Sequence, residues 1–211
     1  MYIGWPKEYF FERVDPEVLR AVEAAAKLFE SLGARIEEVG LPHVSESVDP
    51  STNIALAEAT RDHESQGFFP ARASDYGGDV RSRLEMGTQV RAVDYLRGLE
   101  IKQALAKDFD DAFERVDAIL APATPIAAPR IGEHEVKIGG EKETVRSALV
   151  RMNRPANLTG HPAISIPCGF TRDKLPVGLQ LIGPRYGEAK LLAIALAYED
   201  ATEWHKRHPE L

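Results

Sequence analysis

The sequence predicts an α/β fold in which a sheet is covered by helices on both faces. Apolar strand candidates alternate with helical segments along the 211 residues, and proline and glycine separate them. The strand candidates are apolar at successive positions, which is typical of strands buried on both faces. No repeat, low-complexity tract or long linker interrupts residues 1–211, so we expect a single domain.

The N-terminal part predicts a strand, a helix and a second strand. Residues 2–5 form a short apolar run. Asp15 can cap the free backbone N–H groups of a following helix, Pro16 is tolerated in its first turn, and Gly33 ends it. Residues 34–39 then predict the second strand. This order is that of a right-handed crossover between parallel strands.

The middle of the chain predicts three helices, over residues 49–66, 79–87 and 92–116, with a turn-rich loop at 68–78. Apolar residues recur at three-to-four spacing along the longest helix, which predicts a stripe buried in the core. The stripe consists of Val93, Leu96, Ile101, Leu105, Phe109, Phe113 and Val116.

Basic residues also gather in this middle part. They are Arg81, Arg83, Arg91, Arg97, Lys102 and Lys107. Acidic residues are interspersed among them, namely Asp79, Glu85, Asp94 and Glu100. Such a mixture is typical of a solvated helix face.

The last part predicts strands and one more helix. The strand candidates cover residues 118–121, 135–138, 141–145, 163–166 and 177–182. Gly139 and Gly140 favour an exposed hairpin between the second and third of these. A final helix is predicted over residues 188–205. Its packing residues are Leu191, Leu192, Ala195, Leu196 and Tyr198.

Composition excludes several classes of function. Lys and Arg number 26 and Asp and Glu 33, and the resulting net charge of −7 is the wrong sign for a partner made of nucleic acid. No apolar run approaches about 18 residues, so we expect neither membrane insertion nor secretion. The single cysteine, Cys168, excludes an internal disulfide framework and fits a reducing compartment. We therefore expect a cytoplasmic protein.

Cofactor and metal motifs are lacking in the sequence. No glycine-rich phosphate loop follows a strand, so no nucleotide cofactor is predicted. His205 and His208 have no third ligand nearby in the sequence, and they are interpreted as two solvated histidines.

Two single residues are candidates for catalysis. His161 could be a base, but no serine or cysteine occupies a recognisable nucleophile turn, which favours a structural loop histidine. Cys168 follows a predicted strand, and without a visible activating cation a buried inert thiol is favoured. The residues by themselves therefore predict no catalytic group.

Several sequence blocks carry a resemblance to a known family. The longest is RPANLTGHPAISIPCGF at residues 154–170, followed by LPVGLQLIG at 175–183; earlier blocks include IGWP at 3–6, RLEMG at 83–87 and PATP at 122–125. In this order and spacing they resemble the C-terminal half of the amidase signature family, over almost the whole chain.

The resemblance implies a function and also a missing part. Family members hydrolyse amide C–N bonds with a serine, a second serine in a cis peptide and a lysine, all in the N-terminal half. Nothing in the present sequence resembles that segment. Acyl transfer needs an activated nucleophile and an oxyanion hole. We therefore expect a truncated or split amidase, either an expressed fragment or the product of a shortened gene, that is inactive until the other half is supplied.

The resemblance also implies a place for substrate. The two halves of the family share one mixed sheet in an α/β/α fold, and this half helps to wall the substrate cleft. The turns at 122–125 and 157–160 are the expected cleft-lining segments. Thr124, Asn157 and Thr159 are the predicted substrate-binding residues. The alternative for each is a structural role, in which the side chain only satisfies backbone groups.

One branch of the family binds glutamine through an arginine and an aspartate. The resemblance to these glutamine amidotransferase A subunits places Lys102 and Val150 at the two positions. A valine cannot accept hydrogen bonds from an ammonium group, so free glutamine is not expected to bind specifically. The nearest polar alternatives to Val150 are Arg151 and Asn153.

Partners follow from the same reasoning. A small-molecule amide is the expected substrate once the chain is completed. A sheet that lacks its other half leaves an unpaired edge and apolar surface, so a homo-oligomer or a complementing chain is expected. The alternative functions are a stand-alone, non-catalytic ligand- or partner-binding module and a fragment of a glutamine amidotransferase A subunit.

Overall fold

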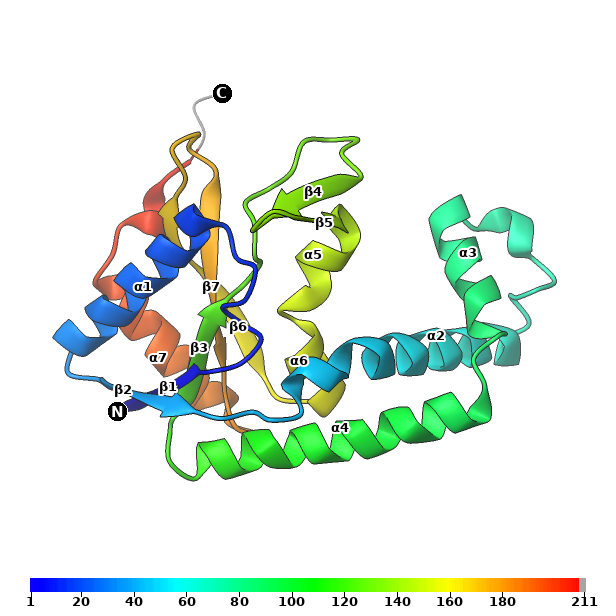
Figure 1. Cartoon of the computed structure of the whole chain (residues 1–211), viewed down its shortest axis with the longest axis horizontal. Helices are drawn as coiled ribbons and strands as arrows, with labels where there is room; N and C mark the ends of the chain where they lie inside the picture. The colour runs from blue at the N-terminus through cyan, green and yellow to red at the C-terminus, as the bar shows by residue number, and fades with distance from the viewer. Residues whose placement is uncertain (209–211) are drawn as a thin grey trace.

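A computed structural model describes residues 1–208 and contains a mixed five-stranded sheet, whose arrangement is seen in Figure 1. Its strands are β1 (Tyr2–Pro6), β2 (Arg35–Val39), β3 (Ala118–Pro122), β6 (Ala163–Phe170) and β7 (Pro176–Ile182), in the order β2-β1-β3-β7-β6. β1 pairs in parallel with β2 and β3, whereas β7 pairs antiparallel with β3 and β6. The predicted α/β class with a mixed sheet is confirmed.

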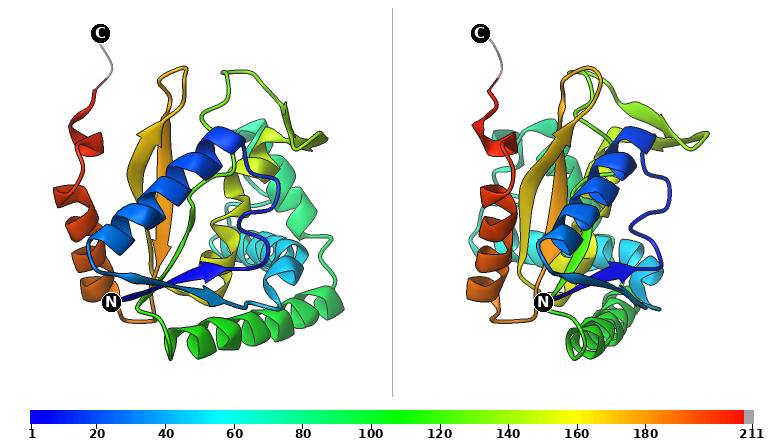
Figure 2. Two further views of the ribbon diagram at one scale, coloured as in Figure 1. Left: turned by 60° about the vertical axis from the view of Figure 1, so that its left-hand side comes forward. Right: turned by 90° about the vertical axis from the view of Figure 1, so that its left-hand side faces the viewer.

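Helices cover both faces of this sheet (Figure 2). α1 (Pro16–Ser31) and α7 (Glu188–Asp200) pack in one apolar core, and α4 (Ala92–Phe113) and α6 (Arg154–Thr159) pack in the other. β3 divides its side chains between them: Ala118 and Leu120 enter the first core, Ile119 and Ala121 the second. Alternate residues thus point to opposite, equally buried faces, as the continuous apolar run predicts.

The predicted connection from β1 through α1 to β2 is confirmed. The Asp15 carboxylate accepts a hydrogen bond from the backbone N–H of Glu17 at 2.7 Å, which caps α1. Gly33 follows the helix with φ of 91°, a conformation that costs glycine little. The two strands are parallel, with Tyr2 opposite Arg35.

The predicted hairpin is also confirmed, as β4 (Glu135–Ile138) and β5 (Glu141–Thr144). Gly139 and Gly140 have φ of 61° and 94°, as a tight hairpin turn requires. Two short helices, α5 (Val145–Arg151) and α6, were not predicted. Each has no more than seven residues, too few for an apolar period to emerge.

The remaining helices are α2 (Val48–Ser65) and α3 (Gly78–Gly87). Three short 3-10 helices also occur, η1 (Val44–Ser47), η2 (Ala73–Asp75) and η3 (Trp204–Lys206). The C-terminal half of α2, all of α3 and the N-terminal half of α4 extend away from the sheet, and we call residues 55–98 the arm (Figure 1). The rest of the described chain is the body.

The predicted core stripe is wrong along the arm. Leu105 and Phe109 of α4 are fully buried, but Val93 and Leu96 are 60% and 57% exposed. The stripe continues, yet within residues 1–208 no element covers its N-terminal end. α4 also ends at Phe113 rather than at residue 116.

The last helix needs two corrections. α7 ends at Asp200, because the chain turns there before η3, and does not continue to residue 205. Leu191, Ala195 and Tyr198 are buried as predicted. The other two predicted packing residues, Leu192 and Leu196, are each 57% exposed. Each of them follows a buried residue of α7 by one position, so its side chain points to the flank of the helix and not to the buried face.

Candidate functional site

A hollow of about 390 Å³ lies between α2, α3, α4, α5 and α6. Four cationic side chains line it, each from a different helix: Arg83, Lys102, Arg146 and Arg154. Glu58 of α2 also lines it. We call this site the basic hollow. Its volume lies within the range of small-molecule pockets.

Local sequence spacing and helix packing bring these groups together. Arg146 and Val150 are four residues apart on α5 and therefore share one face. Gly98 allows α4 to approach α2 closely, since a Cβ there would lie 3.2 Å from Ile54. Lys102, one helical turn further along α4, is thereby carried to the side of α2.

The charge of the basic hollow is not balanced. None of the ion pairs within residues 1–208 involves Arg83, Lys102, Arg146 or Arg154. Glu58 accepts a hydrogen bond from the Tyr95 hydroxyl at 3.0 Å. The hollow can therefore attract an anionic group.

The guanidinium groups are close enough to repel one another. Burial lowers the pKa of Arg83, and the positive charges of Arg146 and Arg154 lower it further. Arg154 donates a hydrogen bond to the Val48 carbonyl at 3.3 Å, which fixes its side chain near the start of α2. The prediction of a solvated helix face is thus wrong for Arg83 and Lys102, which are half-buried in this hollow.

The structure brings three residues singled out in the sequence into this one hollow. Asn157, a predicted substrate-binding residue, is exposed there. Lys102 and Val150, the positions matched to the glutamine-binding pair, line the same space. Their meeting supports the register of that match, because the two residues belong to different helices.

The two alternatives to Val150 point elsewhere. Arg151 is buried and donates hydrogen bonds to the carbonyls of Glu12 and Arg13 at 2.9 and 2.7 Å. The Asn153 amide is directed back to the Leu149 carbonyl, 3.5 Å away. Neither residue lines the basic hollow.

The predicted threonines lie outside the basic hollow. Thr159 is buried and donates a hydrogen bond to the Pro155 carbonyl at 2.9 Å, within its own helix. Thr124 donates to the Ile126 carbonyl at 2.7 Å. Both hydroxyls satisfy backbone groups here. A substrate-binding role for Thr124, Asn157 and Thr159 stays a prediction.

His161 and Cys168, the two single candidates for catalysis, are both buried in the body. His161 is 5% exposed, lies 2.8 Å from the Thr159 hydroxyl and 3.3 Å from Asp110, and burial lowers its pKa. Cys168 lies inside β6 rather than after a strand, because β6 runs on to Phe170. It is 3% exposed, and burial raises its pKa to about 12. The interpretation as a buried thiol is confirmed.

Metal ligands and membrane-spanning helices are lacking in the part of the chain that the structure describes. Within residues 1–208 no three or more His, Cys, Asp and Glu side chains form a group that could hold a metal ion. His205 and His208 are both exposed. None of the described helices combines the length and apolar character needed to span a bilayer.

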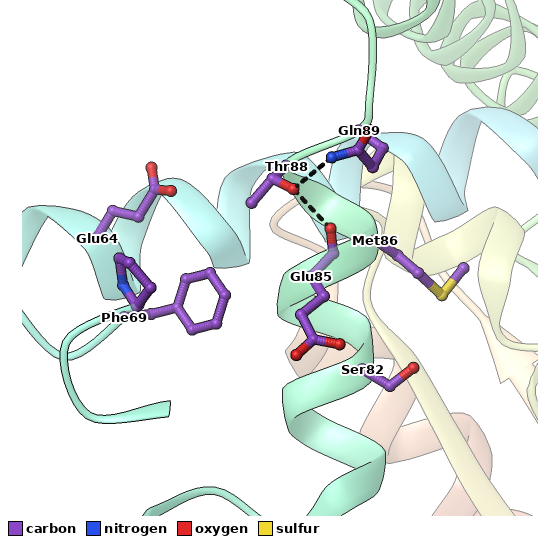
Figure 3. Close-up of a pocket in the computed structure, with 8 residues that line it drawn as sticks. Glu64, Phe69, Ser82, Glu85, Met86, Thr88 and Gln89 are labelled. Carbon is purple, nitrogen blue, oxygen red and sulfur yellow. Dashed lines mark hydrogen bonds between the residues drawn. The ribbon is translucent and has the colours of Figure 1, made fainter. Parts of the chain in front are cut away.

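A second hollow, of about 570 Å³, lies on the arm between the end of α2 and α3 (Figure 3). Glu64 and Glu85 line it together with Phe69 and Met86. The Thr88 hydroxyl donates a hydrogen bond to the Glu85 carbonyl in the last turn of α3, at 2.7 Å. No residue predicted for substrate lies in it, so the basic hollow is the better candidate.

A mixed sheet between helix layers, with a charged hollow of ligand size beside it, defines an α/β protein with a candidate ligand site. A model of the Amidase family matches residues 1–192. An amidase of Pseudomonas putida is 40% identical over 210 positions, which cover 99% of this chain and 44% of that protein. The chain belongs to the amidase signature family, as the resemblance predicts.

Other relatives are similar over the same length. The glutamyl-tRNA(Gln) amidotransferase of Geotalea daltonii has an A subunit that is 36% identical over 231 positions, covering 99% of this chain and 47% of that protein. A crystal structure of an amidase superposes with a TM-score of 0.81 at 28% identity, covering 95% of this chain and 45% of the other. The chain spans about half the length of the curated relatives it matches.

Proposed function

We propose that this chain is the substrate-cleft half of a hydrolase that cleaves an amide C–N bond. In this proposal the basic hollow is its contribution to the cleft. The observation that carries the proposal is the convergence of Lys102, Val150 and Asn157, from three helices, in one space of ligand size. Membership of the amidase signature family supplies the reaction class.

The groups of the chain support a binding role and not a nucleophilic one. Cys168, with its raised pKa and its place inside the core, is neither ionised near neutral pH nor accessible. His161 has both ring nitrogens within hydrogen-bond distance of other side chains. The cations can hold and orient a substrate, whereas the serine nucleophile, its lysine and the oxyanion donors would come from the other half.

Reconstitution tests this function. The chain is mixed with the N-terminal half of the Pseudomonas putida amidase, the part that this chain does not match and in which the family carries its catalytic serines and lysine. We call it the signature-containing half. Ammonia release from a panel of aliphatic and aromatic amides is then measured. Turnover is expected from the mixture and not from the chain alone. Turnover by the chain alone that disappears in C168A, or in S165A, which removes the hydroxyl of the serine in the 154–170 block, would overturn the proposal.

A stand-alone binding module is the second candidate. The observation that favours it is that the basic hollow is formed entirely by residues of this chain. Ligand binding by the chain, with no turnover after reconstitution, would favour this module over the hydrolase.

A fragment of a glutamine amidotransferase A subunit is the third. A relative with that name is 36% identical, against 40% for the Pseudomonas putida amidase, but Val150 offers no acceptor for the glutamine ammonium group. Saturable glutamine binding by the reconstituted protein, lost in K102A, would favour this branch.

The proposal extends to partners and location. Exposed apolar residues on the arm support association with a complementing chain or a second copy; they include Val80, Met86, Val93 and Leu96. A cytoplasmic location fits a chain whose one cysteine is a free buried thiol.

A further inference from the structure

The cations of the basic hollow differ from two exposed cations of the same helices, Arg81 of α3 and Lys107 of α4. On α3, Arg81 lies 3.9 Å from Glu85 in an i,i+4 pair. On α4, Lys107 pairs with Asp111 in the same way. The residues turned into the hollow from these two helices, Arg83 and Lys102, form no ion pair within residues 1–208. These two outward cations are therefore paired with carboxylates, whereas Arg83 and Lys102 are not.

This arrangement carries an energetic cost that a ligand could remove. Arg83 is half-buried beside Arg146 and Arg154, so like charges face one another in a partly desolvated space. Among the lining residues Glu58 supplies one negative charge against four positive ones, and Asp79, outside the lining, offsets part of the repulsion at Arg83. The protein as a whole has a net charge of −7, so the positive charge of this concave site is opposite to that of the whole protein.

We propose that the basic hollow binds an oxyanion group of the substrate, a carboxylate or a phosphate, so that the amides cleaved are anionic. This inference rests on the proposed function and specifies its substrate class. Guanidinium groups suit both oxyanions, because their planar N–H donors form paired hydrogen bonds. Lys102 adds a compact charge from α4.

The test measures binding by the chain itself, without turnover. Calorimetric titrations use succinate, inorganic phosphate and neutral succinamide as probes, at constant ionic strength. We expect at least one of the two anions to bind saturably and succinamide not to bind. Binding of succinate alone points to a carboxylate on the substrate, and binding of phosphate alone points to a phosphate.

Variants locate the binding. R146Q should weaken anion binding by about tenfold, since Arg146 is exposed and its loss leaves the fold intact. R81Q, the matched control from the outer face of α3, should bind as the unchanged chain does. The inference is overturned if neither anion saturates, if succinamide binds equally well, or if R146Q and R81Q behave alike.

Failure of this inference can be told apart from failure of the proposed function. If the reconstituted protein hydrolyses neutral amides and the chain binds neither anion, the hydrolase function stands and the anionic substrate class is wrong. If the chain binds an anion but the reconstituted protein shows no turnover, the anion site stands and the hydrolase function is wrong.

Discussion

The two halves of α4 show how differently the body and the arm are built. Its C-terminal half packs Leu105 and Phe109 against the sheet, fully buried. Its N-terminal half carries the same apolar period, but Val93 and Leu96 are more than half exposed. An apolar stripe therefore predicts which face of a helix is covered, but it does not predict which element or partner covers that face. The exposed N-terminal half of the stripe supports the proposal that a partner binds the arm.

The largest effect is expected in the body. F109A removes a fully buried ring from the core beneath the sheet, where Phe109 stacks near Phe113 and His161. It should lower the free energy of unfolding by about 3 to 5 kcal/mol. Urea unfolding followed by circular dichroism measures the loss. L96A on the same helix is the control, and an equal loss in both variants would contradict the contrast between the two halves.

A smaller effect is expected where α3 packs on α2. A Cβ on Gly87 would lie 2.0 Å from the Thr60 hydroxyl oxygen and 2.4 Å from the Leu56 carbonyl. G87A should therefore separate the two helices and lower the free energy of unfolding by about 1 to 3 kcal/mol. Limited proteolysis should show faster cleavage of the arm.

Gly78 provides the matched control for this variant, because a Cβ there meets no atom within 4 Å. G78A should leave both stability and cleavage pattern close to those of the unchanged chain. Equal cleavage of G87A and G78A would show that the close packing of α2 and α3 does not hold the arm together.

A pH effect is expected at the junction of α4, α6 and β7. Burial lowers the pKa of His161, and the charged groups facing it are Asp110 and Arg185. The folded state thus holds the neutral imidazole. As the pH falls below the unfolded-state value of about 6.5, the unfolded chain binds the proton first, and stability declines.

The comparison with a variant isolates this group. Urea unfolding of the unchanged chain and of H161Q is measured at pH 7 and pH 5. The loss of stability between the two pH values should be larger for the unchanged chain. An equal loss in both would mean that His161 does not contribute to the pH dependence.

The smallest effect on stability is expected on the arm. The double variant V93S and L96S removes two exposed apolar groups, so the free energy of unfolding should change by no more than about 0.5 kcal/mol per site. Association should change much more. Light scattering should find a dimer or larger species for the unchanged chain and a monomer for the variant. A monomer in both cases would remove the support for a partner on the arm.

Local sequence signals predicted the body well. The cap at Asp15, the positive φ of Gly33 and the paired glycines of the hairpin depend on neighbouring residues only. β3 could be identified because it is apolar on both faces.

The candidate site was harder to predict, because helix packing assembles it. Glu58 lies on a helix with a weak apolar face, and it shares the hollow with Lys102 because α2 and α4 approach closely at Gly98 and Ile54. α5 and α6 are too short to show a period. The acidic neighbours of Arg83 in the sequence predict a solvated face, whereas in space the cations Arg146 and Arg154 also act on it, beside Asp79.

The central claim is that this chain is one half of an amide hydrolase and supplies the wall of its cleft. The most direct measurement titrates a fixed amount of the signature-containing half of the Pseudomonas putida amidase with increasing amounts of this chain and follows ammonia release. The account predicts activity that rises and saturates near equal amounts of the two, with none from either half alone. Activity of the signature-containing half that is unchanged by the chain would contradict it.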